Sequence, residues 1–347
     1  MFLTSTCTCQ WQGITGACSP STLRPARVAV PQGLSSTMLS LGRLVLPKPR
    51  CHAPRLASVS MGSRSTDVIS QQAFFALVEE CRGKTDETID LGGCRVELRE
   101  PLDVRGNCRL RIANGIIAGS GHAIIQQSTN RDGLLALSDL ILLHSASPER
   151  AAKRNLGAAL FCRGKSELKL NRCTISSEAG FGVWLVQRSS VLLSSCELPG
   201  SGRSSVVAFD QSRVECVDTS ILDAMPHAIC ARGQSRVIVR RCTIARAYSR
   251  AIYNYHNSTL DVSDSHVSGT RSDEAAAVQM DALRPGDAST LTIANTLFEG
   301  NAGGDLSVSG NVERRIGSEV AVVEREAESF GRASAKVRDG HGELVDF

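Results

Sequence analysis

SELKLNRCTI, residues 166–175, is the first of six similar ten-residue segments in this chain. The others are SSVLLSSCEL (189–198), SRVECVDTSI (212–221), SRVIVRRCTI (235–244), STLDVSDSHV (258–267) and STLTIANTLF (289–298). The eighth position holds Cys, Thr or Ser, and it recurs every 23 residues from Cys173 to Ser265. Thr296 follows after 31 residues, which indicates an eight-residue insertion. A fixed period of this length is typical of a solenoid, in which each repeat is one structural unit stacked on the last.

The spacing within each repeat indicates which solenoid this is. Apolar residues alternate in the first half, as at Leu168 and Leu170, which is the period of a half-buried strand. A second short strand turns Ile175 inward, and a third does the same with Val183 and Leu185. Three strands per 23 residues predict an all-β fold, a right-handed parallel β-helix whose equivalent positions stack about 4.8 Å apart. The leucine-rich repeat, the main alternative, lacks its Leu-x-x-Leu-x-Leu-x-x-Asn pattern here.

The N-terminal leader differs from the body in composition. Residues 1–66 carry seven Lys and Arg and no Asp or Glu, so the remainder has 32 basic and 35 acidic residues, a net charge of −3. A leader rich in Ser, Thr, Pro and Arg is typical of an organellar transit peptide, and this composition favours a plastid over a mitochondrion. A disordered tail or a wrongly assigned start codon is the alternative. The near-neutral body gives no reason to expect nucleic acid, and no apolar run approaches a membrane span.

The cysteines of the repeats indicate packing. Cys173, Cys196 and Cys242 share a column that elsewhere holds Thr or Ser, so this column is expected to need a small inward side chain. No CxxC pair occurs after the leader, so neither a zinc site nor a thioredoxin-like site is predicted. A bridge between Cys173 and Cys196, on successive coils, is the less favoured alternative.

A capping helix is predicted within residues 66–87. Ser70 is suited to start it and Gly83 to end it. Its apolar residues fall at helical spacing: Phe74, Leu77, Val78 and Cys81. A solenoid needs such a cap to close the open end of its core.

The coils after this helix carry a family resemblance. TIDLGG (88–93), PLDV (101–104) and LRIANGIIAG (110–119), with the later SxLxLxxCxI coils, resemble the pectin-lyase-like right-handed β-helix superfamily over about residues 69–308. Together with the leader this gives four expected parts: a leader (1–65), the capping helix (66–87), the β-helix (88–310), and a C-terminal cap or tail (311–347). The resemblance implies a fold and leaves activity open, because the superfamily includes lyases, hydrolases, epimerases and non-catalytic binding modules.

Insertions lengthen two corners of the predicted coils. Residues 143–158 and 268–276 extend the corner between the second and third strands, and residues 281–288 extend the next one. Loops of this kind either form the wall of a binding groove or have no function. The two readings are equally open.

Charged residues gather on the outward face of the first strand. They are Arg213, Glu215, Arg236, Arg240 and Asp261. Arginine near carboxylates suits a lyase or epimerase acting on uronic acids, with arginine neutralising the substrate carboxylate and Glu215 or Asp261 as acid or base. Glu215 and Asp261 are two coils, or roughly 10 Å, apart, beyond the roughly 6.5–9.5 Å of inverting glycosidases. A salt-bridge ladder through Asp218 and its column is the favoured interpretation.

Aromatic residues gather on the outward face of the third strand. The candidate binding residues are Trp184, Phe209, Arg232, Tyr253, Tyr255 and His256. Aromatic rings on a flat face can stack sugar rings, and arginine adds polar contacts. An exposed apolar strip needs a cover, which is the chain's own C-terminal segment, a partner protein or a glycan.

Two functions follow from these surfaces. The favoured one is a non-catalytic binding or scaffold module for a glycan or a protein, and the alternative is a uronate lyase or epimerase. The galacturonan-hydrolase residue set is absent, and Gly340-His341-Gly342 alone carries no weight. No cofactor or metal site is predicted, and Ca²⁺ is expected only if the chain is a lyase. The sequence leaves the oligomeric state open.

Overall fold

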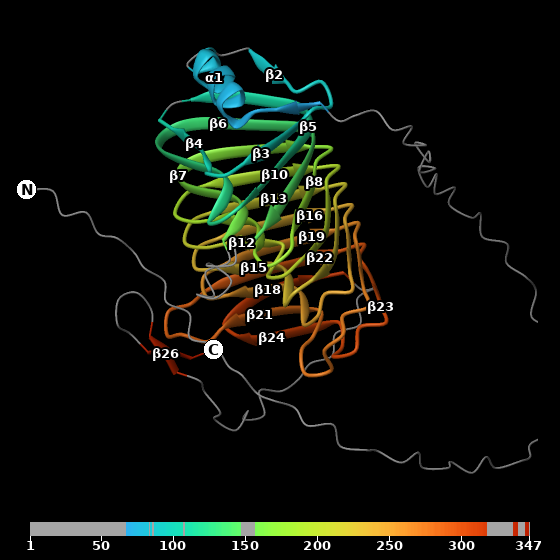
Figure 1. Cartoon of the computed structure of the whole chain (residues 1–347). Coiled ribbons are helices and arrows are strands. Elements are labelled where there is room, and N and C mark those ends of the chain that lie inside the picture. The colour runs from blue at the N-terminus through green and yellow to red at the C-terminus, as the bar shows by residue number, and fades with distance from the viewer. Residues whose placement is uncertain are drawn as a thin grey trace, which may run out of the picture.

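The computed structural model describes residues 67–82, 84, 87–106, 108–146, 157–317, 336–338 and 344–346. The chain winds through successive coils of short parallel strands, and the helix α1 (Gln71–Cys81) lies over one end of the stack (Figure 1). Apart from the antiparallel pair β26 (Lys336–Arg338) and β27 (Leu344–Asp346), all described pairings are parallel. No helix in the described ranges is long and apolar enough to cross a membrane.

The strands form three parallel sheets along the stack. The long strands β5 (Arg109–Ser120), β6 (Ala123–Ser145) and β7 (Ala158–Asn171) turn corners and contribute to more than one sheet. The first sheet adds β2 (Thr88–Asp90), β10 (Ser190–Ser194), β13 (Arg213–Val217), β16 (Arg236–Arg240), β19 (Thr259–Ser263), β22 (Ser289–Ala294) and β25 (Val312–Ile316). The second adds β1 (Val68–Ile69), β3 (Arg95–Leu98), β8 (Thr174–Ser177), β11 (Glu197–Ser201), β14 (Ser220–Ala224), β17 (Thr243–Ala245), β20 (His266–Ser268) and β23 (Leu297–Glu299). The third adds β4 (Leu102–Arg105), β9 (Phe181–Leu185), β12 (Val206–Ala208), β15 (His227–Arg232), β18 (Arg250–Tyr255), β21 (Val278–Ala282) and β24 (Leu306–Gly310).

In the regular coils, each residue of a strand pairs with the residue 23 positions further along the chain. Leu193 of β10 pairs with Cys216 of β13, and Val206 of β12 pairs with Ile229 of β15, each 23 residues further on. The inward columns predicted from the alternation are buried throughout the regular coils. Phe298, on the last strand of the second sheet, is only partly buried. The predicted all-β parallel β-helix is therefore confirmed.

The corner between the first and second sheets is formed at a residue with positive φ, as at Asp218 and Arg241 with φ 51°. Near the end of β14, Asp223 also has positive φ, at 50°. Left-handed backbone costs a non-glycine residue roughly 1–2 kcal/mol. Side-chain ladders help to hold these corners: the Arg241 guanidinium donates two hydrogen bonds of 2.8 Å to the Asp218 carboxylate. The predicted salt-bridge ladder is confirmed at this step.

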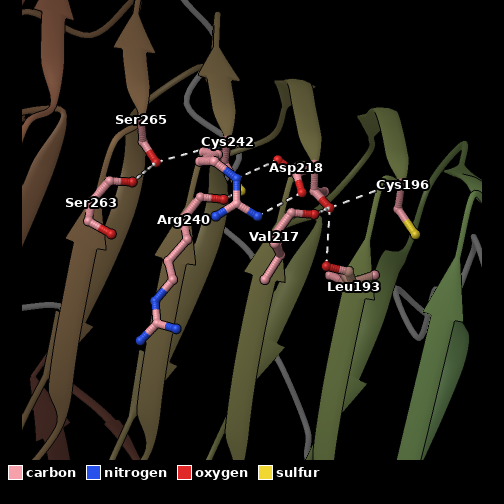
Figure 2. A network of polar contacts seen from close by, with 10 residues as sticks. Leu193, Cys196, Val217, Asp218, Arg240, Cys242, Ser263 and Ser265 are labelled. Atoms are coloured by element: carbon pink, nitrogen blue, oxygen red, sulfur yellow. Dashed lines mark hydrogen bonds and ion pairs between the residues drawn. The ribbon is translucent and has the colours of Figure 1, made fainter.

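The small eighth residue of each repeat lies just inside the first corner (Figure 2). Ser265 Oγ donates to the carbonyl of Ser263 (2.7 Å) and accepts the Cys242 N–H from the coil before (3.1 Å). The Cys242 thiol likewise donates to the Arg240 carbonyl at 3.2 Å. The predicted small, inward column is confirmed. All nine described cysteines are free, so the bridge between Cys173 and Cys196 was a wrong alternative.

The capping helix forms where the sequence predicts it. The Ser70 hydroxyl accepts the Ala73 N–H at 3.2 Å, and Phe74 and Val78 are buried against the first coils. Leu77 is 40% exposed, so its predicted burial was wrong. The helix presents only a narrow apolar stripe to the coil, and Leu77 falls outside it. Gly83 lies outside the described residues.

The inserted corners are shorter than predicted, because strands extend into them. β6 continues to Ser145 and β7 begins at Ala158, so the first insertion is confined to residues 146–157, of which only 146 and 157 are described. The 268–276 insertion lies between β20 and β21 as predicted. Asp281 and Ala282 belong to β21, which leaves 283–288 as the third loop. The C-terminal cap or tail lies largely outside the described residues.

Candidate binding face

The predicted binding residues lie together on the outer face of the third sheet. We call the outward side chains of β7, β9, β12, β15 and β18, with the corner after β18, the third-sheet face. Trp184, Val207, Cys230 and Tyr253 follow one another in register along it, and Arg232 pairs with Tyr255 beside them. Phe209 follows β12, and His256 occupies the corner after β18 with φ 66°.

This face is more enclosed than the exposed apolar strip that the sequence predicted. Val207 at its centre is only 2% exposed, and Trp184, Phe209, Tyr253 and Tyr255 are each partly buried. The rings pack against one another and against arginines, so the strip is already partly covered by its own residues. The further cover expected from the C-terminal segment, a partner protein or a glycan stays a prediction.

Four rings at the end nearer α1 form the tryptophan cluster, made of His122, Phe161, Phe181 and Trp184. Trp184 is 5.0 Å from Phe161, 5.4 Å from Phe181 and 5.8 Å from His122, measured between ring centroids. The Arg203 guanidinium lies 5.5 Å from the centroid of the Phe181 ring. Burial lowers the pKa of Arg203. Within the described structure, the buried Trp184 indole N–H has no acceptor.

Five side chains further along form the tyrosine cluster: His227, Arg232, Arg250, Tyr253 and Tyr255. The two tyrosine rings stack with centroids 4.9 Å apart and 22° between their planes. Arg250 lies 4.6 Å from the Tyr253 ring and Arg232 lies 5.8 Å from the Tyr255 ring. Each tyrosine therefore packs against a ring and a cation already, and a sugar ring would compete with an arginine for its face.

Burial dominates the electrostatics of the tyrosine cluster. It raises the pKa of both tyrosines, so their hydroxyls stay protonated. Burial, together with the charge of Arg250, lowers the pKa of His227 to about 3. His227 is thus neutral at physiological pH, and its Nδ1 has no hydrogen-bond partner in the described structure.

The corner after β18 adds a histidine–carboxylate pair. His256 Nδ1 lies 3.2 Å from Asp287 Oδ2, and the same oxygen accepts the Arg284 N–H at 3.1 Å. Burial lowers the pKa of His256, and the bond to Asp287 opposes this shift. Nε2 is buried with no partner among the described residues. The ring can therefore offer Nε2 as an acceptor while Nδ1–H holds Asp287.

The arginines of this face differ from the arginines at the coil corners. At the corners, Arg172 pairs with Asp139 at 2.7 Å and Arg246 pairs with Asp223 at 2.6 Å. Arg250 instead donates to the neutral Gln279 and Ser249, and Arg232 to the neutral Tyr255 hydroxyl. Neither has a carboxylate at ion-pair distance in the described part of the chain. Burial raises the pKa of the Asp281 carboxyl, which lies in register with Tyr255, and the nearby charge of Arg250 opposes this rise. The face therefore presents two arginines without an ion pair, beside one buried carboxyl.

The five catalytic candidates lie on the first sheet, where the structure brings four of them into two ion pairs. Arg213 contacts Glu215 at 2.9 Å, and Arg240 contacts Asp261 at 4.0 Å. Arg236 stands in register with Arg213, and the buried Ile238 separates Glu215 from Asp261. The two carboxylates thus remain two coils, or roughly 10 Å, apart. In the described ranges, no group of three or more His, Cys, Asp or Glu could hold a metal ion.

The comparisons with known proteins agree with this architecture. Residues 151–323 match a protein family described as the right-handed beta helix region. This chain is a right-handed β-helix protein. The match covers the regular coils of the β-helix and agrees, at the level of the fold, with the pectin-lyase-like resemblance. Comparison with curated proteins and with solved structures gave no match.

Several residues of the β-helix were missed by the sequence reading. His122, Phe181, His227 and Arg250 pack into the two clusters from strand starts and corners, one or more positions outside the outward columns. Asp287 lies in an inserted loop, where the repeat gives no position. The only available signal was the density of rings and arginines around each third strand.

Proposed function

We propose that this β-helix is a non-catalytic binding module that holds an acidic carbohydrate chain along its third-sheet face. The observation that supports the proposal is the presence on one face of two arginines without an ion pair, Arg232 and Arg250, together with buried ring nitrogens that have no hydrogen-bond partner, at Trp184, His227 and His256. Buried polar groups without partners are costly, so a ligand that supplies acceptors gains binding free energy there.

The chemistry of an acidic glycan matches what the face offers. Its hydroxyls supply acceptors for the Trp184 indole N–H and partners for the His227 imidazole. Carboxylates or sulfates pair with Arg232 and Arg250, where a guanidinium donates two parallel hydrogen bonds. The apolar edge of the tryptophan cluster packs against the C–H face of a sugar ring.

The direct test is a glycan array, read alongside a polysaccharide-degradation screen, on the full-length chain. We expect binding of acidic glycans with no unsaturated product. Trp184→Ala and Arg250→Gln should each weaken binding by roughly tenfold or more, because each removes a desolvated contact. Arg213→Gln, the same change of charge on the first sheet, is the matched control and should leave binding unchanged.

Three results would contradict this function. Release of unsaturated or epimerised sugar would make the chain an enzyme. Glycan binding that survives both third-sheet substitutions would place the ligand elsewhere. An array with no binding at all would remove carbohydrate as the ligand class and leave a partner protein on this face to be tested.

A further inference from the structure

A hollow of about 650 Å³ lies on the outer face of the second sheet, near the α1 end of the β-helix. Strands β3, β5, β6 and β8 line it, so it spans four successive coils. Small-molecule sites commonly measure about 300–1,000 Å³. We call this site the second-sheet hollow. It lies on a different sheet from the proposed glycan face and does not depend on it.

Two outward columns build the hollow. The first gives a floor of small and apolar side chains from Ala118, Leu143 and Ser176. The second places Ser120 opposite Ser145, with Arg99 directly before Ser120 in the stack and Glu178 directly after Ser145. A polar column therefore runs along the apolar floor, with a cation at one end and an anion at the other.

The side chains of Arg99 and Glu178, at the two ends of this column, have charges that a ligand can pair with. Arg95 and Glu97 neutralise each other at 2.5 Å. Arg99 and Glu178 are exposed, and neither makes an ion pair within the described part of the chain. Their Cα atoms are three coils apart, or roughly 14 Å, so the two side chains can reach toward the ends of one small molecule without touching each other.

The floor is held rigidly from beneath. His144 is 3% exposed, and its ring nitrogens contact Ser177 Oγ at 2.8 Å and the Gly121 carbonyl at 3.0 Å. At the Arg99 end, the Gln71 side chain of α1 accepts the Arg99 N–H at 2.6 Å, which fixes the strand end to the capping helix. The hollow is thus built on sheet and helix, which position a ligand more accurately than loops do.

We propose that the second-sheet hollow binds a short peptide with free termini, its carboxylate at Arg99 and its ammonium group at Glu178. The charges at the two ends are opposite, which selects a zwitterion over a simple anion. Ser120 and Ser145 can exchange hydrogen bonds with the peptide amides, and Leu143 packs against small side chains. No Phe, Tyr or Trp is among the residues that line the hollow, and the His144 imidazole is buried beneath the floor, so a sugar ring has no stacking partner here.

The test uses trialanine as the probe and the full-length chain, with binding followed by saturation-transfer NMR and calorimetry. N-acetyl-trialanine amide, which lacks both terminal charges, is the ligand control. We expect Arg99→Gln and Glu178→Gln each to weaken trialanine binding by roughly threefold to fivefold, the scale of an exposed ion pair. The double exchange Arg99→Glu with Glu178→Arg should restore affinity, because the peptide can then bind in the reverse direction.

Three outcomes would overturn the proposal: equal affinity for free and blocked peptide, single variants that bind as the parent does, or no binding at millimolar trialanine. Both changed side chains are exposed, so the fold should persist, and circular dichroism of each variant checks this. Glycan binding on the third-sheet face is unaffected by any of these results.

Discussion

At the scale of single residues, the fold depends on which side chains its corners and inner columns accept. The eighth position tolerates Cys, Thr and Ser because each is small and can donate to the carbonyl two residues earlier, as Thr219 does to Val217 at 2.9 Å. The residue before it carries positive φ, which suits Asp and Asn better than branched side chains. Two properties, size and backbone freedom, therefore explain the composition of adjacent columns.

Cys242 tests the size requirement. Cys242→Ser should change the free energy of unfolding by less than about 1 kcal/mol, because serine fills the same place in the next coil at Ser265. Cys242→Leu should cost about 1–3 kcal/mol through overpacking. Thermal denaturation of the two variants checks this, and equal stabilities would show that the column is not tightly packed.

Asp218 gives a prediction for pH. Its bond to Arg241 lowers the pKa of the Asp218 carboxyl in the folded protein. The ion pair therefore contributes stability above the unfolded carboxyl pKa of about 3.9, and this contribution is lost as pH falls through the lower folded pKa. We expect Asp218→Asn to reduce the acid dependence of the melting temperature slightly and to leave the neutral-pH value within a degree or two, because the pair is exposed. A large loss at neutral pH would mean that the corner itself needs the carboxylate.

At the scale of strands and sheets, each face carries different chemistry. On the first sheet, Arg213 pairs with Glu215 and Arg240 with Asp261, whereas on the third sheet Arg232 and Arg250 lie over tyrosine rings. This division separates the two functional hypotheses in space, so substitutions on one sheet leave the other intact.

Glu215 is the test of the enzymatic alternative. Since Glu215 and Asp261 remain roughly 10 Å apart with Ile238 between them, we expect no uronate cleavage or epimerisation by the parent chain, and glycan binding by Glu215→Gln equal to the parent's. Turnover that disappears in Glu215→Gln, with the fold intact, would establish the first sheet as an active site.

The sequence predicted the strands and their register better than it predicted how the outward side chains pack on the sheet faces. Strands, register and inward columns follow from a period of 23, because a strand side chain points either in or out. The packing of outward rings depends on side chains at strand starts, such as His227 and Arg250, which pair in register but change residue type from coil to coil. The second-sheet hollow was missed because Arg99, Leu143 and Glu178 lie in or beside the irregular first coils, where the repeats cannot be aligned by eye.

At the scale of the whole molecule, the β-helix is a stack in which each coil contacts only its neighbours. Its ends are then the weak points, and α1 protects the first coil by burying Phe74 and Val78. Stability in such a stack is approximately a sum of coil and interface contributions, with caps required at the termini.

Phe74 tests the role of the cap. Phe74→Ala removes a fully buried ring and should cost about 3–5 kcal/mol. Hydrogen exchange should accelerate first in β2, β3 and β4 and last in the central coils around β13. Uniform acceleration along the chain would show instead that the stack unfolds as one unit.

The leader supports a proposal about location. Residues 1–65, rich in Ser, Thr, Pro and Arg and lacking acidic residues, are proposed to direct the chain to a plastid. A fusion of these residues to a fluorescent protein should be imported and shortened by isolated plastids. Retention outside the organelle at full length would contradict this.

The constant 23-residue offset between paired strands of the central coils also limits how that part of the chain can change in length. Removal of residues 212–234, one full coil, would leave Ser189 and Ser235 as neighbours in the stack and every later side chain on its original face. Removal of a single residue within a strand would instead turn each following inward side chain of that strand outward. The strands of these coils can therefore be added or removed only as whole coils, whereas the corners accept shorter insertions such as residues 283–288, and a ligand lying along the third sheet would gain or lose its contacts one coil at a time.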